Sequence, residues 1–131
     1  MKEEEKVKYA IEKLKTAFIR LREGAEEAED ELDKDGVIQR FEFTFELLLK
    51  ALKIYLEYNG IEVRTPRNSL KEAFRINLFD DEEIFLDMLA DRNLTSHIYD
   101  KETSEEIFDR IKAVYIPAIE KVLKKLRTEI E

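Results

Sequence analysis

Apolar residues recur at steps of three or four along almost the whole chain, which is the period of one face of a helix. The first stripe predicts a helix that ends near Gly24, and the second predicts a helix from about Asp35 to Asn59, terminated by Gly60. Residues 25–35 are acidic and poorly amphipathic, so we expect a connection there. The two stripes consist of Val7, Ala10, Ile11, Leu14, Phe18 and Leu21, and of Val37, Ile38, Phe41, Phe45, Leu48, Leu52 and Leu56.

Turn and cap residues predict where the next two helices begin. Thr65 is suited to be an N-cap and Pro66 to be the first helical residue of a short helix that reaches about Ile76. Asp80 or Asp81 is suited to cap the helix after it. The apolar stripe of that helix consists of Ile84, Phe85, Met88 and Leu89, with Leu94 as a candidate extension.

The last helix is predicted to open with a capping box, in which Thr103 is the N-cap and Glu106 the N3 residue. Pro117 lies inside this helix, so the helix should bend or restart there. Four main helices with short connections predict an all-α fold, an antiparallel up-and-down four-helix bundle with an additional short helix. We expect residues 1–131 to form a single domain.

The second helix has more apolar residues than one stripe needs. Phe43, Leu47, Leu49, Ala51 and Ile54 all lie off its main apolar face. A helix that is apolar on most sides is central in its bundle or lies at a subunit interface. We expect both, and the second predicts a homodimer.

The charge of the chain restricts what it can bind. Its 131 residues include 23 Lys and Arg against 31 Asp and Glu, a formal net charge of −8. Proteins that follow a nucleic-acid backbone do so with a basic surface, so this charge argues against broad, non-specific binding of duplexes. It leaves room for a small local site for one phosphate.

The composition also excludes several classes of site. The absence of Cys excludes disulfides, zinc ribbons and thiol nucleophiles, and a single His excludes metal sites built from several histidines. The acidic runs are typical of solvated faces or helix caps, so we expect no metal and no cofactor. No apolar stretch approaches about 20 residues and the N-terminus has no apolar core of a signal peptide, so we expect a cytoplasmic protein.

Residues 91–100 are the only part of the chain that is dense in reactive side chains. On a continuous helix Arg92 and Tyr99 lie near one line, and Asn93 and His97 form an i,i+4 pair. Arg92 and His97 lie about 140° apart on that helix, so they converge only through the length of the arginine or across an interface. An Arg and a His at this spacing are also common by chance, and a lone helical His is usually a structural residue.

The pattern Arg92-x4-His97-x-Tyr99 resembles the signature of HEPN-domain proteins of the HepT type. Residues 35–47 and 87–97 are similar to the nucleotidyltransferase substrate-binding protein family, and the similarity extends over nearly the whole chain. One departure is the pair of leucines at 48 and 49, where the family pattern has Ala-Trp.

The resemblance implies a helical bundle, usually a homodimer, that is made beside a minimal nucleotidyltransferase. In pairs of the HepT and MntA type, the HEPN protein is an RNA-cleaving toxin, and the nucleotidyltransferase is an antitoxin that transfers AMP onto the motif tyrosine. Carried over by position, Arg92 and His97 would cleave RNA, Asn93 would be the polar residue beside the arginine, and Tyr99 would be modified.

These residue types suit RNA cleavage without a metal. An imidazole with a pKa near ~6.5 serves as base or acid at neutral pH, and Arg92 supplies a permanent charge for phosphate oxygens. Each chain has one His, whereas cleavage needs a base for the 2′-hydroxyl and an acid for the leaving oxygen. An isologous dimer would supply the second His97 if the motif lies near the two-fold axis.

Three interpretations of function remain open from the sequence. The first is a HEPN-type ribonuclease toxin that is controlled by AMP transfer to Tyr99. The second is a non-catalytic partner that holds the nucleotidyltransferase or presents its substrate, with Arg92 and His97 structural or nucleotide-binding. The third is a dimeric bundle without a site.

Overall fold

The computed structural model describes residues 2–95 and 100–130, which form six α-helices and one π-helical turn and no strand. The all-α prediction is therefore confirmed. The elements are α1 (Glu3–Glu27), α2 (Glu31–Tyr58), α3 (Pro66–Arg75), α4 (Glu82–Thr95), α5 (Lys101–Arg110), the π-helix η1 (Ile111–Tyr115) and α6 (Ile116–Ile130).

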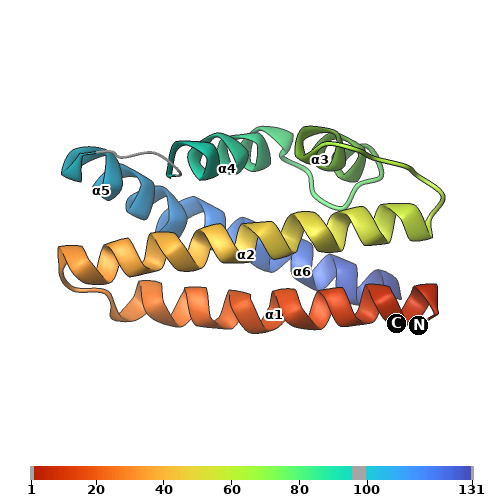
Figure 1. Cartoon of the computed structure of the whole chain (residues 1–131), viewed down its shortest axis with the longest axis horizontal. Coiled ribbons are helices and arrows are strands. Elements are labelled where there is room, and N and C mark those ends of the chain that lie inside the picture. Colours follow the sequence, from red (N-terminus) through yellow and green to blue (C-terminus); the bar gives the residue numbers. More distant parts are fainter. Residues whose placement is uncertain (1, 96–99, 131) are drawn as a thin grey trace.

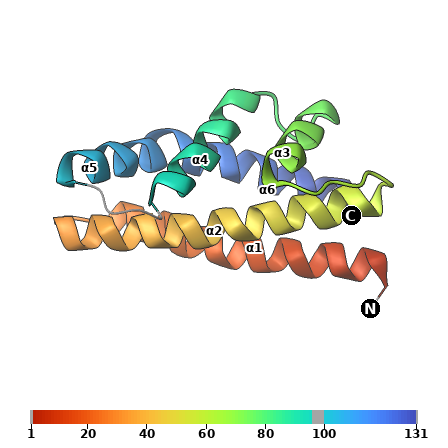
Figure 2. The ribbon, with the colours of Figure 1, turned by 45° about the horizontal axis from the view of Figure 1, so that its top comes forward.

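The long helices α1 and α2 run antiparallel along the whole length of the molecule, with α6 behind them (Figure 1). The shorter helices α3 and α4 lie along the other side of α2, and α5 leads through η1 into α6 (Figure 2). Helix α2 contacts α1, α3, α4 and α5, so its predicted central position is confirmed. None of the helices in the described part of the chain is long and apolar enough to cross a membrane.

The central position of α2 accounts for part of its extra apolar surface. Leu49 and Ala51 are buried within the chain's own core, and Leu47 and Ile54 are partly buried. Phe43 is the one residue of these five that is exposed, with 59% of its surface accessible to solvent. The homodimer stays a prediction.

The connection between α1 and α2 is shorter than predicted. The connection occupies only residues 28–30 of the predicted range 25–35, because α1 continues to Glu27 and α2 begins at Glu31 with Asp30 as its N-cap. The Asp30 carboxylate accepts a hydrogen bond from the backbone N–H of Asp33 at 2.8 Å, and the Asp33 carboxylate accepts from the N–H of Glu29 at 3.0 Å. The backbone N–H of Glu29, and after it that of Asp30, donates to the Asp33 carboxylate and holds the pKa of Asp33 below its usual range. Local capping therefore extends the helix beyond the apolar stripe.

The predicted start of α3 is confirmed, and α4 begins at one of its two candidate caps. The Thr65 hydroxyl accepts from the N–H of Asn68 at 3.1 Å, and Pro66 is the first helical residue. For α4, the Asp81 carboxylate accepts from the N–H of Ile84 at 3.3 Å.

The predicted capping box of the last helix was wrong. Asp100 is the N-cap of α5, because its carboxylate accepts from the N–H of Thr103 at 2.8 Å and the helix starts three residues earlier. Near Pro117 the hydrogen-bond pattern changes as expected, through the π-turn in which the N–H of Ile116 donates to Ile111 O. Pro117 has no N–H to continue the regular ladder, and a wider turn just before it absorbs that loss.

Candidate functional site

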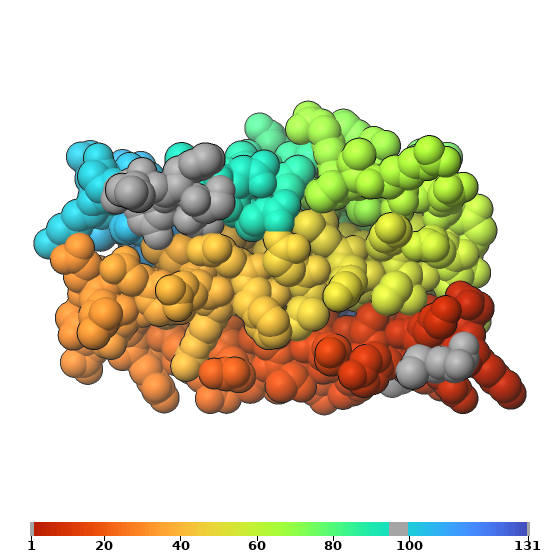
Figure 3. Space-filling model, in the orientation of Figure 1, coloured from red at the N-terminus to blue at the C-terminus, as the bar shows by residue number. Residues whose placement is uncertain are grey.

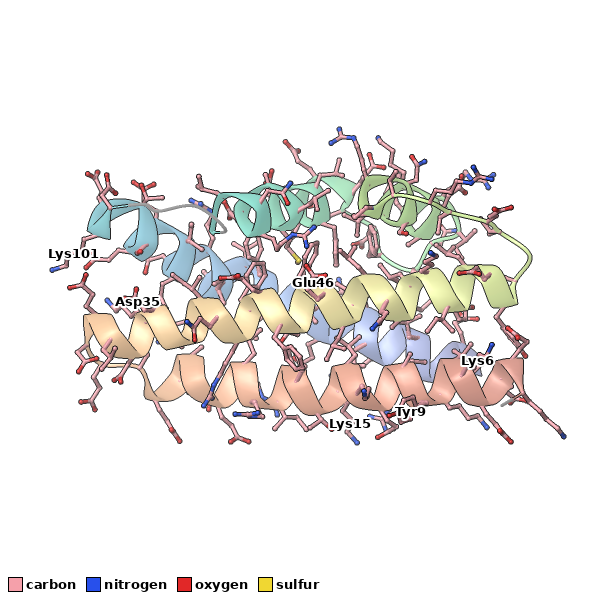
Figure 4. The ribbon with its side chains drawn as sticks, in the orientation of Figure 1. Lys6, Tyr9, Lys15, Asp35, Glu46 and Lys101 are labelled. Atoms are coloured by element: carbon pink, nitrogen blue, oxygen red, sulfur yellow. The ribbon has the colours of Figure 1, made fainter. Side chains whose placement is uncertain are left out.

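Arg92 lies in the last turn of α4 and points to α2. Its Nη1 donates a hydrogen bond to Oε1 of Glu46, and its guanidinium lies 6.0 Å from the ring centre of Phe45. The arginine side chain is 22% exposed and the Glu46 side chain 53% exposed. Figure 4 shows Glu46 on the side of α2 nearest α4. The site therefore presents a positioned guanidinium at the surface, with planar donors suited to phosphate oxygens.

A buried polar cluster lies directly beside Arg92. Asp91 is only 7% exposed and accepts two hydrogen bonds from Arg110, from Nε at 2.8 Å and from Nη2 at 2.9 Å. It also accepts one from the hydroxyl of Tyr115 at 2.5 Å. The cluster thus joins the end of α4 to α5 and η1, on both sides of the segment that carries His97 and Tyr99 in the sequence.

The surroundings of Tyr115 keep its hydroxyl protonated. Burial is the main cause that raises the pKa of Tyr115 well above its usual range, and the hydrogen bond and the charge of Asp91 add to it. The hydrogen bonds with Asp91 are likewise the main cause that raises the pKa of Arg110. The centre of the Tyr115 ring lies 5.4 Å from the centre of the ring of Phe41, a buried residue of α2. The charges of Asp91 and Arg110 are thus paired, and the hydrogen bonds of the cluster connect the end of α4 to α5 and η1.

The described residues offer no group of three His, Asp or Glu side chains placed to hold a metal ion. Asn93 lies beside Arg92 on α4 and is exposed.

The family model for nucleotidyltransferase substrate binding protein-like proteins matches residues 9–128. The chain belongs to this family. Its nucleotidyltransferase substrate-binding fold is shared by a Thermus thermophilus protein of known crystal structure, with 36% identity and a TM-score of 0.81. That match covers 87% of this chain and 98% of the Thermus chain.

A curated relative connects this family member to ribonucleases. It is the Probable ribonuclease HepT of Haemophilus influenzae, which is 35% identical over 81 residues. The match covers 58% of this chain and 56% of that protein, so it spans about half the length of the relative. The predicted relation to HepT-like nucleotidyltransferase substrate-binding proteins is confirmed.

The structure places two of the four site residues predicted for this chain. Arg92 and Asn93 are neighbours at the end of α4. His97 and Tyr99 lie outside the described residues, so their geometry relative to Arg92 stays a prediction.

Two features of the site were missed from the sequence. Glu46, the partner of Arg92, lies 46 residues away in the chain and carried no local signal. Asp91 did carry one, because it falls seven residues after Ile84 and three after Met88, on the apolar stripe of its helix. A carboxylate at such a position predicts buried, paired partners, which are Arg110 and Tyr115.

Proposed function

We propose that this chain is a metal-independent endoribonuclease of the HepT type, in which Arg92 and His97 cleave RNA and Asn93 assists. The observation that carries the proposal is the position of Arg92, which Glu46 and Phe45 hold at the surface five residues before the only histidine. A relative is named a probable ribonuclease, which supports the same reading.

The role of each residue in cleavage follows from the chemistry of its side chain. Cleavage needs a base for the 2′-hydroxyl, an acid for the leaving oxygen and a cation for the charge that develops on phosphorus. His97 is suited to either proton transfer near neutral pH, and Arg92 to the charge. Because each chain holds one His, we propose that a second copy supplies the other His97. The exposed Phe43, one turn before Glu46 on α2, offers this second copy an apolar contact beside Arg92.

Substitution of the two cleaving residues tests the proposal. Arg92→Ala and His97→Ala should each abolish cleavage of single-stranded RNA and growth inhibition, with circular dichroism and melting point nearly unchanged. Arg75→Ala is the matched control, because Arg75 is an exposed arginine that pairs with Glu72 at the end of α3. Wild-type cleavage should persist in EDTA. Full activity of both variants would remove the assignment, and loss of folding in both would make the residues structural.

We also propose that a cognate nucleotidyltransferase silences the enzyme by transferring AMP to Tyr99. The transfer would place a phosphodiester two residues after His97, where its negative charge would compete with RNA for Arg92. Incubation with that partner and Mg-ATP should add AMP to Tyr99 and not to Tyr9 or Tyr58, which are exposed tyrosines elsewhere. Peptide mass spectrometry reads this directly. Tyr99→Phe should stay active and resist silencing, whereas AMP on Tyr99 without loss of cleavage would contradict the control.

A second candidate function is a non-catalytic subunit that binds the nucleotidyltransferase or its substrate. The family description and the net charge of −8 favour it, as does the carboxylate of Glu46 on the guanidinium of Arg92. It predicts a stable complex with the nucleotidyltransferase, dependence of that enzyme on this chain, and no RNA cleavage by the pure protein.

A further inference from the structure

Two hollows lie on either side of one ridge of α2, formed by Leu47 and Lys50. One hollow lies between α1 and α2 and is lined by Lys6, Tyr9, Lys13 and Ile54 together with the ridge. The other lies between α2 and the start of α3, is lined by Phe43, Lys53 and Arg64, and reaches Glu46. Figure 3 views the side of the molecule on which α1, α2 and α3 lie next to one another. We call the cations Lys6, Lys13, Lys50, Lys53 and Arg64 the basic face.

The charge of this surface is opposite to that of the chain. The two hollows together are lined by the five cations of the basic face and by one carboxylate, that of Glu46. Another hollow in the described part of the chain, beside α6, carries Asp80 and Asp81 against Lys121 and Lys125 and is therefore balanced. In a protein of net charge −8, the two hollows beside Leu47 and Lys50 thus have a local excess of positive charge.

The cations of the basic face are available to bind an anion. Within the described residues, Lys13, Lys50 and Lys53 form no ion pair at salt-bridge distance. The ammonium of Lys13 lies 5.1 Å from the ring centre of Tyr9, which is itself 55% exposed. The ion pairs of Lys6 with Glu3 and of Arg64 with Glu62 are exposed pairs at 3.4 Å. Such pairs are weak and exchange readily for another anion.

We propose that the basic face binds the single-stranded RNA substrate, with its lysines on the phosphates and Tyr9 stacked on a base. The proposal rests on the proposed ribonuclease function and names where the substrate strand lies. The surface continues to the site, because Glu46 lines one hollow and its carboxylate holds Arg92. Basic grooves with exposed aromatic rings are the usual means of binding unpaired strands, whose bases are free to stack.

A second copy of the chain is a poorer occupant of this surface. An isologous contact would set the basic face against the same five cations of the partner, and like charges repel. Phe43 lines the hollow beside α3, so a dimer contact centred on it would cover part of that hollow and leave Lys6, Lys13 and Tyr9, which line the other hollow, open to RNA. The five cations therefore suit a polyanion, and the exposed ring of Tyr9 suits a polyanion with unpaired bases, which is single-stranded RNA.

Binding of a labelled 12-nucleotide RNA with 2′-O-methyl groups tests the proposal by fluorescence anisotropy. The probe keeps phosphates and bases but lacks the nucleophile, so cleavage does not interfere. The double variant Lys13→Glu/Lys50→Glu should weaken the Kd about tenfold or more at low salt and lower the salt slope by about 1.4, since each of the two lost phosphate contacts contributes about 0.7 on a single strand. The matched control is Lys121→Glu/Lys124→Glu on α6, with the same change of charge on exposed lysines. It should change the Kd less than threefold.

Two further arms separate RNA from other partners. Tyr9→Ala should weaken binding about fivefold or more without changing the salt slope, since stacking releases no counterions. Poly-L-glutamate at equal charge should displace the probe less well than unlabelled RNA. Equal displacement by poly-L-glutamate and by RNA would overturn the proposal and assign the basic face to an acidic protein. Equal Kd values for the two double variants would also overturn it.

The proposal and the proposed function fail separately. Loss of cleavage in Arg92→Ala together with unchanged probe binding in Lys13→Glu/Lys50→Glu would remove the basic face alone. Loss of probe binding in that double variant, with cleavage retained in Arg92→Ala and His97→Ala, would keep the RNA surface and remove the ribonuclease assignment.

Discussion

The carboxylate of Glu46 on α2 and the guanidinium of Arg92 on α4 form an ion pair between residues that are 46 positions apart. The pair fixes the arginine above Phe45 and at the same time neutralises part of its charge. Any phosphate that binds Arg92 must therefore compete with Glu46 or share the guanidinium with it.

The first prediction concerns this competition. Glu46→Gln keeps a hydrogen-bond acceptor but removes the negative charge, so RNA should bind up to about fivefold more tightly, as a partly exposed ion pair of up to ~1 kcal/mol allows. The anisotropy assay and the KM of cleavage measure this effect. Glu57→Gln is the control, since Glu57 is an exposed carboxylate near the C-terminal end of α2. Weaker binding in Glu46→Gln would mean that the carboxylate is needed to position Arg92.

The second prediction concerns the support of α4. Tyr115→Phe removes one of the hydrogen-bond donors of the buried Asp91, which should cost about 1–3 kcal/mol in the free energy of unfolding. Urea titration followed by circular dichroism measures it. Tyr58→Phe changes an exposed tyrosine and should stay within about 0.5 kcal/mol. Equal stability of the two variants would show that Arg110 alone satisfies Asp91.

The same residue predicts a dependence of stability on alkaline pH. The pKa of Tyr115 is raised in the folded protein, whereas an unfolded tyrosine ionises near ~10. The folded state therefore binds more protons above about pH 10, and stability falls as the pH rises. The contribution of Tyr115 is complete below about pH 10 and is lost above it. The stability difference between wild type and Tyr115→Phe should stay constant up to about pH 10 and shrink as the pH rises above it, and a difference that stays constant above about pH 10 would contradict this.

The third prediction concerns the start of α2. Asp30→Ala removes the acceptor for the N–H of Asp33 and should lower the free energy of unfolding by about 1 kcal/mol. Glu29→Ala is the control, because only the backbone N–H of Glu29 takes part in the cap. Thermal melting of both variants gives the comparison. Equal melting points would show that this end of α2 does not take part in the cooperative unfolding of the domain.

The fourth prediction concerns assembly. At micromolar concentration the wild type should sediment as a homodimer, and Phe43→Ser should shift it to the monomer by removing the exposed ring of α2. Leu32→Ser is the control, since Leu32 is 79% exposed at the far end of the same helix. A monomeric wild type would end both the homodimer and the composite site with two copies of His97.

Signals that act within one or two turns were readable from the sequence. The apolar stripes determined which segments are helices, and Thr65 with Pro66 determined where α3 begins, because a cap bonds to a backbone N–H only three residues away. Where two such signals competed, the sequence did not settle the boundary. Asp100 and Thr103 both offer side-chain acceptors, and the structure uses Asp100.

Contacts between helices were decided only by the tertiary structure. The sequence singled out Arg92, but its pairing with Glu46 depends on how α2 and α4 are rotated against each other, which no local pattern encodes. The same holds for charge. The sequence determined a net charge of −8, but this total says nothing of where the charges lie. Only the packing of α1 and α3 against α2 brings Lys13, Lys50 and Arg64 onto one surface.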